Sequence, residues 1–189
     1  MKNIMNITAF LIVAAIVILA GCNADNTSKS NQLNLIEDTA GRPDSEVRNA
    51  RIYLYDEGRV TTEIFSTEIH KFDELDSTMG YQLDIDFFDS TGAVMSEVVG
   101  DSGIIREQTG HLSIYGNVVV VTEDKTKLET DYLFWNTTTD KIYTDAFVRV
   151  TSEDGVLTGW GLEADQRLSS YQILSKVSGS SDNITPDLK

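Results

Sequence analysis

Apolar and polar residues alternate along most of the chain after residue 47, as they do in β-strands with one buried face. In the stretch 81–88, for example, Leu83, Ile85 and Phe87 alternate with polar side chains. Clusters of Gly, Asn, Asp and Ser separate such stretches and are typical of turns. The pattern therefore predicts an all-β domain.

The expected strands are short and closely spaced. They cover residues 51–55, 60–66, 81–88, 93–99, 103–107, 111–115, 118–122, 127–135, 141–144, 147–151, 156–164 and 171–177. A turn is expected at Gly116-Asn117, and residues 70–78 predict a helical turn or a loop. Strands at this spacing are typical of a sandwich, a barrel or a roll.

Part of the strand pattern repeats. Residues 114–117 align with residues 142–145 at an offset of 28, and the offset rises to 29 where Val121 aligns with Val150. A period near 30 residues indicates antiparallel hairpins that stack and bury their apolar faces against one another. Chance similarity among valine-rich strands is the alternative.

The N-terminus has the features of a bacterial lipoprotein leader. After Lys2, residues 7–21 are apolar except for Thr8, and Leu19-Ala20-Gly21-Cys22 resembles a lipobox. We expect residues 1–21 to be a signal peptide and Cys22 to carry lipid, because the apolar run is shorter than the ~20 residues of a membrane span. A plain secretory leader and an uncleaved anchor helix are the alternatives. Cys22 is the only cysteine, so the domain has no disulfide.

The rest of the chain divides by composition. Residues 22–46 are polar and small, which predicts a lipidated N-terminus and flexible tether. Residues 47–178 form the expected β domain, and residues 179–189 a flexible tail.

Charge narrows the range of partners. The chain has 30 acidic and 15 basic residues and a net charge of −15. Nucleic-acid affinity depends on clustered Lys and Arg, so we expect no nucleic-acid partner. A hydrophobic content of 41% is sufficient for a packed core.

One tetrapeptide invites an enzymatic interpretation. Gly100-Asp101-Ser102-Gly103 resembles the nucleophile motif of trypsin-like serine proteases, and His70, Asp84 and Ser102 follow that family's chain order. The spacing between His70 and Ser102 is too short for the two barrels of that fold, and the Gly and Asp are typical of a strand connection. We therefore expect no catalytic residues and no enzyme.

The titratable residues also give no metal motif. His70 and His111 have neither metal-binding spacing nor a thiolate partner. Asp84, Asp86 and Asp89 lack the glycine spacing of a calcium loop. We expect no metal and no cofactor.

Residues 100–179 resemble the LptC family, with a weaker likeness back to about Val47, and more distantly the related LptA and OstA-like proteins. The residues that carry the resemblance are 110–118, 128–133, 141–145, 148–150 and 155–162. The family implies an open β-jelly roll, built of repeated antiparallel hairpins, that receives lipopolysaccharide from an inner-membrane ABC transporter. It then passes the lipid to an LptA-like periplasmic bridge protein, without catalysis. Known members have an uncleaved transmembrane helix where this chain has a lipobox.

The resemblance to the LptC family implies a lipid-binding groove. We expect the lipid A acyl chains to contact a set of aliphatic residues on the strands of the two repeats, with Arg149 pointing outward. They are Val119, Val121, Val148, Val150, Leu157 and Leu162. An OstA-like structural or assembly lipoprotein with a filled core, and a periplasmic carrier of other lipids, are the alternatives.

The last expected strand has no proline and only one charge, which leaves it fit to pair with another chain. We expect its residues Tyr171, Gln172, Ile173, Leu174 and Ser175 to meet the LptA-like partner. The edge at residues 51–55 would then face the transporter subunits. An interior strand, paired on both sides, is the alternative. The expected location is the periplasmic face of the envelope, anchored by lipid in the inner rather than the outer membrane.

Overall fold

The computed structural model describes residues 41–180 except residues 107, 137 and 140. The expected signal peptide, Cys22, most of the tether and residues 181–189 lie outside this range. All described residues belong to one compact unit of the chain. Within this range, none of the helical structure has the length and apolar character needed to cross a membrane.

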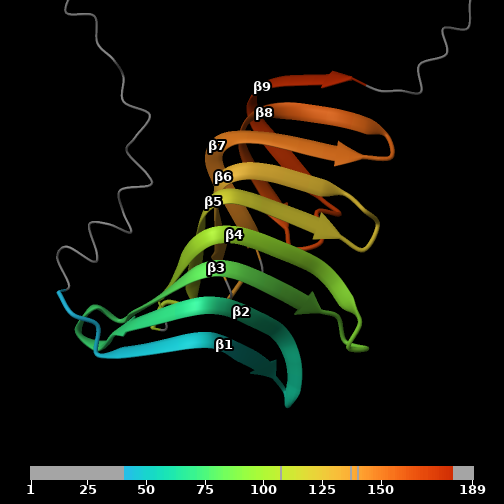
Figure 1. Cartoon of the computed structure of the whole chain (residues 1–189). Coiled ribbons are helices and arrows are strands. Elements are labelled where there is room, and N and C mark those ends of the chain that lie inside the picture. Colours follow the sequence, from blue (N-terminus) through green and yellow to red (C-terminus); the bar gives the residue numbers. More distant parts are fainter. Residues whose placement is uncertain (1–40, 107, 137, 140, 181–189) are drawn as a thin grey trace, which may run out of the picture. The chain divides into compact units, whose positions relative to one another are not determined.

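The described chain folds into one antiparallel sheet. Its strands are β1 (Ser45–Asp56), β2 (Arg59–Phe72), β3 (Ser77–Phe88), β4 (Val94–Arg106), β5 (His111–Thr122), β6 (Lys127–Asn136), β7 (Lys141–Ser152), β8 (Gly155–Asp165) and β9 (Tyr171–Ser180). Their order in the sheet is the order in the chain, so the sheet is open and β1 and β9 are its edges (Figure 1). The all-β prediction is confirmed.

The strands are longer than the alternation pattern predicts. Three pairs of expected strands are joined into the single strands β4, β5 and β7. Gly116-Asn117, expected as a turn, lies inside β5, where the pairing with β6 shifts register. The helical turn expected within residues 70–78 is the short 3-10 helix η2 (Asp73–Leu75). Glycine and asparagine are common in both turns and bulges. Pairing with the neighbouring strands decides which of the two forms.

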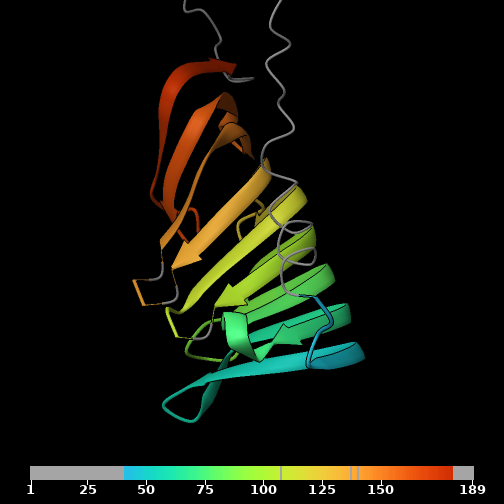
Figure 2. The ribbon, with the colours of Figure 1, turned by 90° about the vertical axis from the view of Figure 1, so that its left-hand side faces the viewer.

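A line of backbone irregularities crosses the sheet near the middle of the strands. Each position is a register shift or a residue with positive φ: Asn49, Gln82, Asp101, Asn117, Asp131, Asp145, Gly161 and Lys176. At one of them, Asn117 Nδ2 donates a hydrogen bond to Asp101 Oδ2 over 2.8 Å. Bulges bend strands and increase their twist, and the strands curve and twist progressively from β1 to β9 (Figure 2).

The bend lets two parts of one face pack against each other. This inner face carries a row of directly opposed residues from edge to edge, which we call the inner row: Ile52, Ile64, Ile85, Val98, Val120, Leu128, Val150, Leu157 and Gly179. Beyond the bulges, a second row on the same face contains Ile105, Leu112, Trp135, Ile142, Ala164 and Tyr171. Residues of both rows belong to one hydrophobic cluster.

The pairing of β5 with its neighbours places other residues of this strand on the inner face than the sequence predicts. Val118 and Val120 are 1% exposed and belong to the core, whereas Val119 and Val121 are half-buried. The expectation that Val119 and Val121 point inward is therefore wrong. It followed from aligning Val121 with Val150, whereas the pairing places Val120 in one row with Val150. An error of one residue exchanges the two faces of a strand.

Candidate functional site

The inner row makes the inner face apolar from one edge of the sheet to the other. Its central members, from Ile64 in β2 to Val150 in β7, are at most 4% exposed. Its ends are more open, because Ile52 in the edge strand β1 is half-buried and Leu157 in β8 is 37% exposed. The apolar surface therefore reaches solvent next to both unpaired edges.

The remaining expected groove residues lie on or near this row. Val148, Val150 and Leu162 are fully buried. Leu157 lies directly opposite Val150, so its side chain is on the inner face although it is exposed. Arg149 is exposed, as expected.

The interior is closely packed in this conformation. The cavity among Ile52, Ile64, Leu83, Gly103 and Leu112 has room for about one water molecule. Gly103 is required there because a Cβ at this position would lie 2.5 Å from Leu83 Cδ1 and 2.8 Å from the Ser113 carbonyl oxygen. An acyl chain therefore needs side chains or strands to separate.

A larger cavity of about 770 Å³ lies where the two parts of the inner face meet solvent. We call it the mouth. Its lining comes from the β3–β4 and β8–β9 connections, including Arg167, and from strand residues that include Leu54, Phe87, Met95 and Trp135. Arg167 Nε lies 2.7 Å from Met95 Sδ, which brings the β8–β9 connection against β4.

Two buried polar atoms near the mouth have no hydrogen-bond partner in the described structure: Trp135 Nε1 and Ser96 Oγ. The Trp135 ring packs edge-to-face on Phe87 with the centroids 4.7 Å apart. An unpaired buried donor costs about 1–3 kcal/mol. Trp135 thus combines a large apolar ring with a donor for an acceptor such as a carbonyl. The sequence could have suggested Trp135 only as one more aromatic residue, because its position at the mouth depends on the bend of the sheet.

The outer face of β2–β4 is acidic. Glu63, Asp86 and Glu97 lie directly opposite one another on successive strands, and Asp84 is two residues from Asp86 on the same face. Desolvation, followed by the charges of Asp84 and Glu97, raises the pKa of Asp86. This face repels anionic groups and contrasts with the apolar inner face.

The residues of the rejected protease motif have structural positions. Ser102 lies in β4 opposite Tyr81 and Tyr115, and Asp101 is part of the line of bulges. The imidazole of His70 interacts with Glu68 rather than with Ser102 or Asp84 in the contacts described.

Asp89, considered for a calcium loop, caps its own turn. Its carboxylate accepts hydrogen bonds from the backbone amide and hydroxyl of Thr91 and from the amide of Ala93, and these bonds lower its pKa. The hydrogen-bonding capacity of the Asp89 carboxylate therefore serves the turn itself.

Strand β9 is an edge strand, so the alternative of an interior strand is wrong. Gln172, Leu174 and Ser175 are exposed, whereas Tyr171 and Ile173 are half-buried and pack on the core. Tyr171 and Ile173 therefore hold β9 to the domain, while no described strand pairs with its outer backbone edge.

The comparison with protein families identifies the group to which this architecture belongs. The model of the family described as "Lipopolysaccharide-assembly, LptC-related" matches residues 10–182. The chain belongs to the LptC family. The match begins inside the N-terminal apolar run and extends through β9. A search of curated proteins finds no match.

Members of the LptC family are components of lipopolysaccharide transport rather than known enzymes. They are periplasmic, associated with the inner membrane, and work with lipopolysaccharide, the Lpt transporter and the bridge proteins. The predicted family resemblance is thus confirmed over most of the chain.

Proposed function

We propose that this LptC-family protein is a lipid-anchored periplasmic bridge component. It receives lipopolysaccharide from the inner-membrane ABC transporter and passes it to the next bridge protein during outer-membrane biogenesis. The observation that carries this proposal is the inner row, which is apolar through β8 and ends at Gly179 in the edge strand β9. Burial of apolar surface favours acyl chains on this face over water.

The proposed path follows the inner row. Acyl chains would enter as the two parts of the inner face separate at the mouth, and the more open ends at Ile52 and Leu157 would continue the path into neighbouring proteins. The polar headgroup would remain in solvent outside the mouth. Because the protein has no proposed catalytic group, ATP hydrolysis by the transporter would supply the free energy.

The proposed edge contacts use backbone hydrogen bonding. β9 would add a strand of an LptA-like protein, and β1 would face the transporter, because each of these edges has only one neighbour among the described strands. In this arrangement the inner row of one protein adjoins that of the next.

The anchor is proposed on Leu19-Ala20-Gly21-Cys22. Replacing Cys22 with Ala should abolish lipidation and leave the uncleaved precursor, which metabolic labelling with radioactive fatty acid and the mass of the protein will measure. The wild-type chain is the positive control. Fatty acid on the Cys22→Ala protein, or an unchanged mass, would show that the anchor lies elsewhere.

Depletion of the protein in its native bacterium tests the transport role. Newly made lipopolysaccharide should accumulate in the inner membrane, and restoring the protein should release it. Normal arrival at the outer membrane would favour the alternative of a structural lipoprotein with a filled core, which the closely packed interior also supports. Accumulation of a different lipid would favour the carrier alternative.

A further inference from the structure

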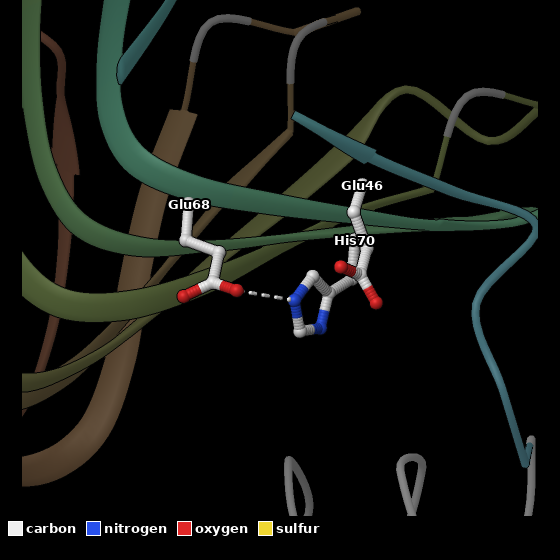
Figure 3. Close-up of side chains that lie close together, drawn as sticks. All are labelled: Glu46, Glu68 and His70. Carbon is white, nitrogen blue, oxygen red and sulfur yellow. Dashed lines mark hydrogen bonds and ion pairs between the residues drawn. The ribbon is translucent and has the colours of Figure 1, made fainter. Parts of the chain in front are cut away.

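On the outer face of the β1–β2 ribbon, strand pairing brings together three side chains with metal-ligand chemistry. Glu46 in β1 lies directly opposite His70 in β2. Glu68 precedes His70 by two residues, so its side chain is on the same face. Figure 3 shows the carboxylates of Glu68 and Glu46 near the imidazole of His70.

The distances are close to those of a metal centre. One donor atom from each of Glu46, Glu68 and His70 lies within 4.8 Å of the others. His70 Nε2 and Glu68 Oε1 are already 3.0 Å apart. Bonds of about 2.0–2.2 Å in a tetrahedral site place donors roughly 3.3 Å from one another. Glu46 is exposed and can close the remaining distance by side-chain rotation.

The surroundings favour this arrangement. The His70 ring packs edge-on against Tyr81 with the centroids 5.4 Å apart, which restricts its orientation. Apart from His70 itself, the nearest basic group to the Glu68 carboxylate among the ion pairs described is Arg48 Nη2, at 4.0 Å. Lys71 pairs with Asp73 at 3.3 Å. A bound cation would offset the repulsion between the two glutamates.

We propose that Glu46, Glu68 and His70 form a Zn²⁺ site with a water molecule in the fourth position. One imidazole and two carboxylates suit Zn²⁺, whereas Ca²⁺ and Mg²⁺ require six or more oxygen ligands. The ion would link the edge strand β1 to β2. The spacing of histidines alone predicts no site, because Glu46 reaches His70 only through cross-strand pairing.

The test uses the full-length chain, purified without an affinity tag and treated with chelator. Zn²⁺ titrated by calorimetry should bind with one-to-one stoichiometry. Glu46→Gln, Glu68→Gln and His70→Gln should each weaken binding by about tenfold or more, because loss of even an outer-shell partner costs 10–100-fold. Zn²⁺ should also slow amide exchange in β1 of the wild type.

His111→Gln is the matched control, since it removes the other imidazole, and it should bind Zn²⁺ as the wild type does. X-ray absorption at the zinc edge should show nitrogen and oxygen ligands without sulfur, which separates the site from Cys22. Glu46 is exposed, so Glu46→Gln keeps the test informative if the His70 variant misfolds. Absence of binding at 100-fold excess Zn²⁺, sulfur ligation, or unchanged affinity in Glu46→Gln would overturn the proposal.

Discussion

Val120→Asp is expected to lower the free energy of unfolding of the domain strongly, whereas Val121→Asp lowers it only slightly. Val120 is 1% exposed at the centre of the inner row, between Val98 and Leu128. A buried charge without a partner costs about 3–5 kcal/mol, a large share of the 5–15 kcal/mol typical of a domain's stability. Val121 is half-buried on the outer face, where a carboxylate keeps contact with water. It lies between Glu97, which repels a new carboxylate, and Lys127, which attracts it but already pairs with Glu129 at 2.7 Å, so the expected loss is small.

The two variants differ by one position in the same strand, so each is the control for the other. Urea denaturation followed by circular dichroism will give the free energy of unfolding of each. The order of stability should be wild type, then Val121→Asp, then Val120→Asp. A greater loss at Val121 would mean that β5 faces inward with the residues first expected from the repeat, and equal losses would contradict the burial of Val120 alone.

Ending the chain after Ser170 is expected to abolish capture of a periplasmic partner while the domain stays folded. The truncation removes the edge strand β9, of which only Tyr171 and Ile173 pack on the core. Loss of their partial burial should cost no more than about 3 kcal/mol each, the value for a fully buried side chain. Photo-crosslinking residues at Gln172 and Ser175, both exposed in β9, should capture the partner in the complete chain. Co-purification, which does not depend on these positions, should recover the partner with the complete chain and not with the chain that ends after Ser170.

Two controls isolate the role of β9. A chain that ends after Ser180 keeps β9 and should retain the adducts at Gln172 and Ser175. A crosslinker at Glu153, which is exposed in the β7–β8 turn, should capture no bridge protein. Crosslinks only within the chain, or unfolding of the chain that ends after Ser170, would show that β9 serves the core and that the bridge forms elsewhere.

Alternation of apolar and polar residues was sufficient to predict the fold class and most strand positions. Ile85 and Val150, for example, occupy the inner face because their neighbours in the chain are polar. The pattern could not identify the line of bulges, because Gly116-Asn117 has the composition of a turn and becomes a bulge only through pairing with β4 and β6.

The site was predictable only in part. Val148, Val150 and Leu162 face inward and are buried, and β9 is an edge, whereas their contact with lipid stays a prediction. The run Val118 to Val121 has no polar residue to indicate which face is buried. The prediction of its inward-facing residues therefore rested on an approximate repeat. The mouth and the Glu46, Glu68 and His70 cluster arise from contacts between strands, for which the sequence has no local pattern.

The most direct test of lipid transfer along the inner face is photo-crosslinking at Leu157 in cells. This side chain shares the inner face with Val150 and is 37% exposed, so a crosslinking residue fits there without disturbing the buried centre. Arg149, exposed on the outer face of the adjacent strand, is the matched control. We predict a lipopolysaccharide adduct at Leu157 that depends on ATP hydrolysis by the transporter, and none at Arg149. No adduct at Leu157, or equal adducts at both positions, would contradict transfer along the inner face.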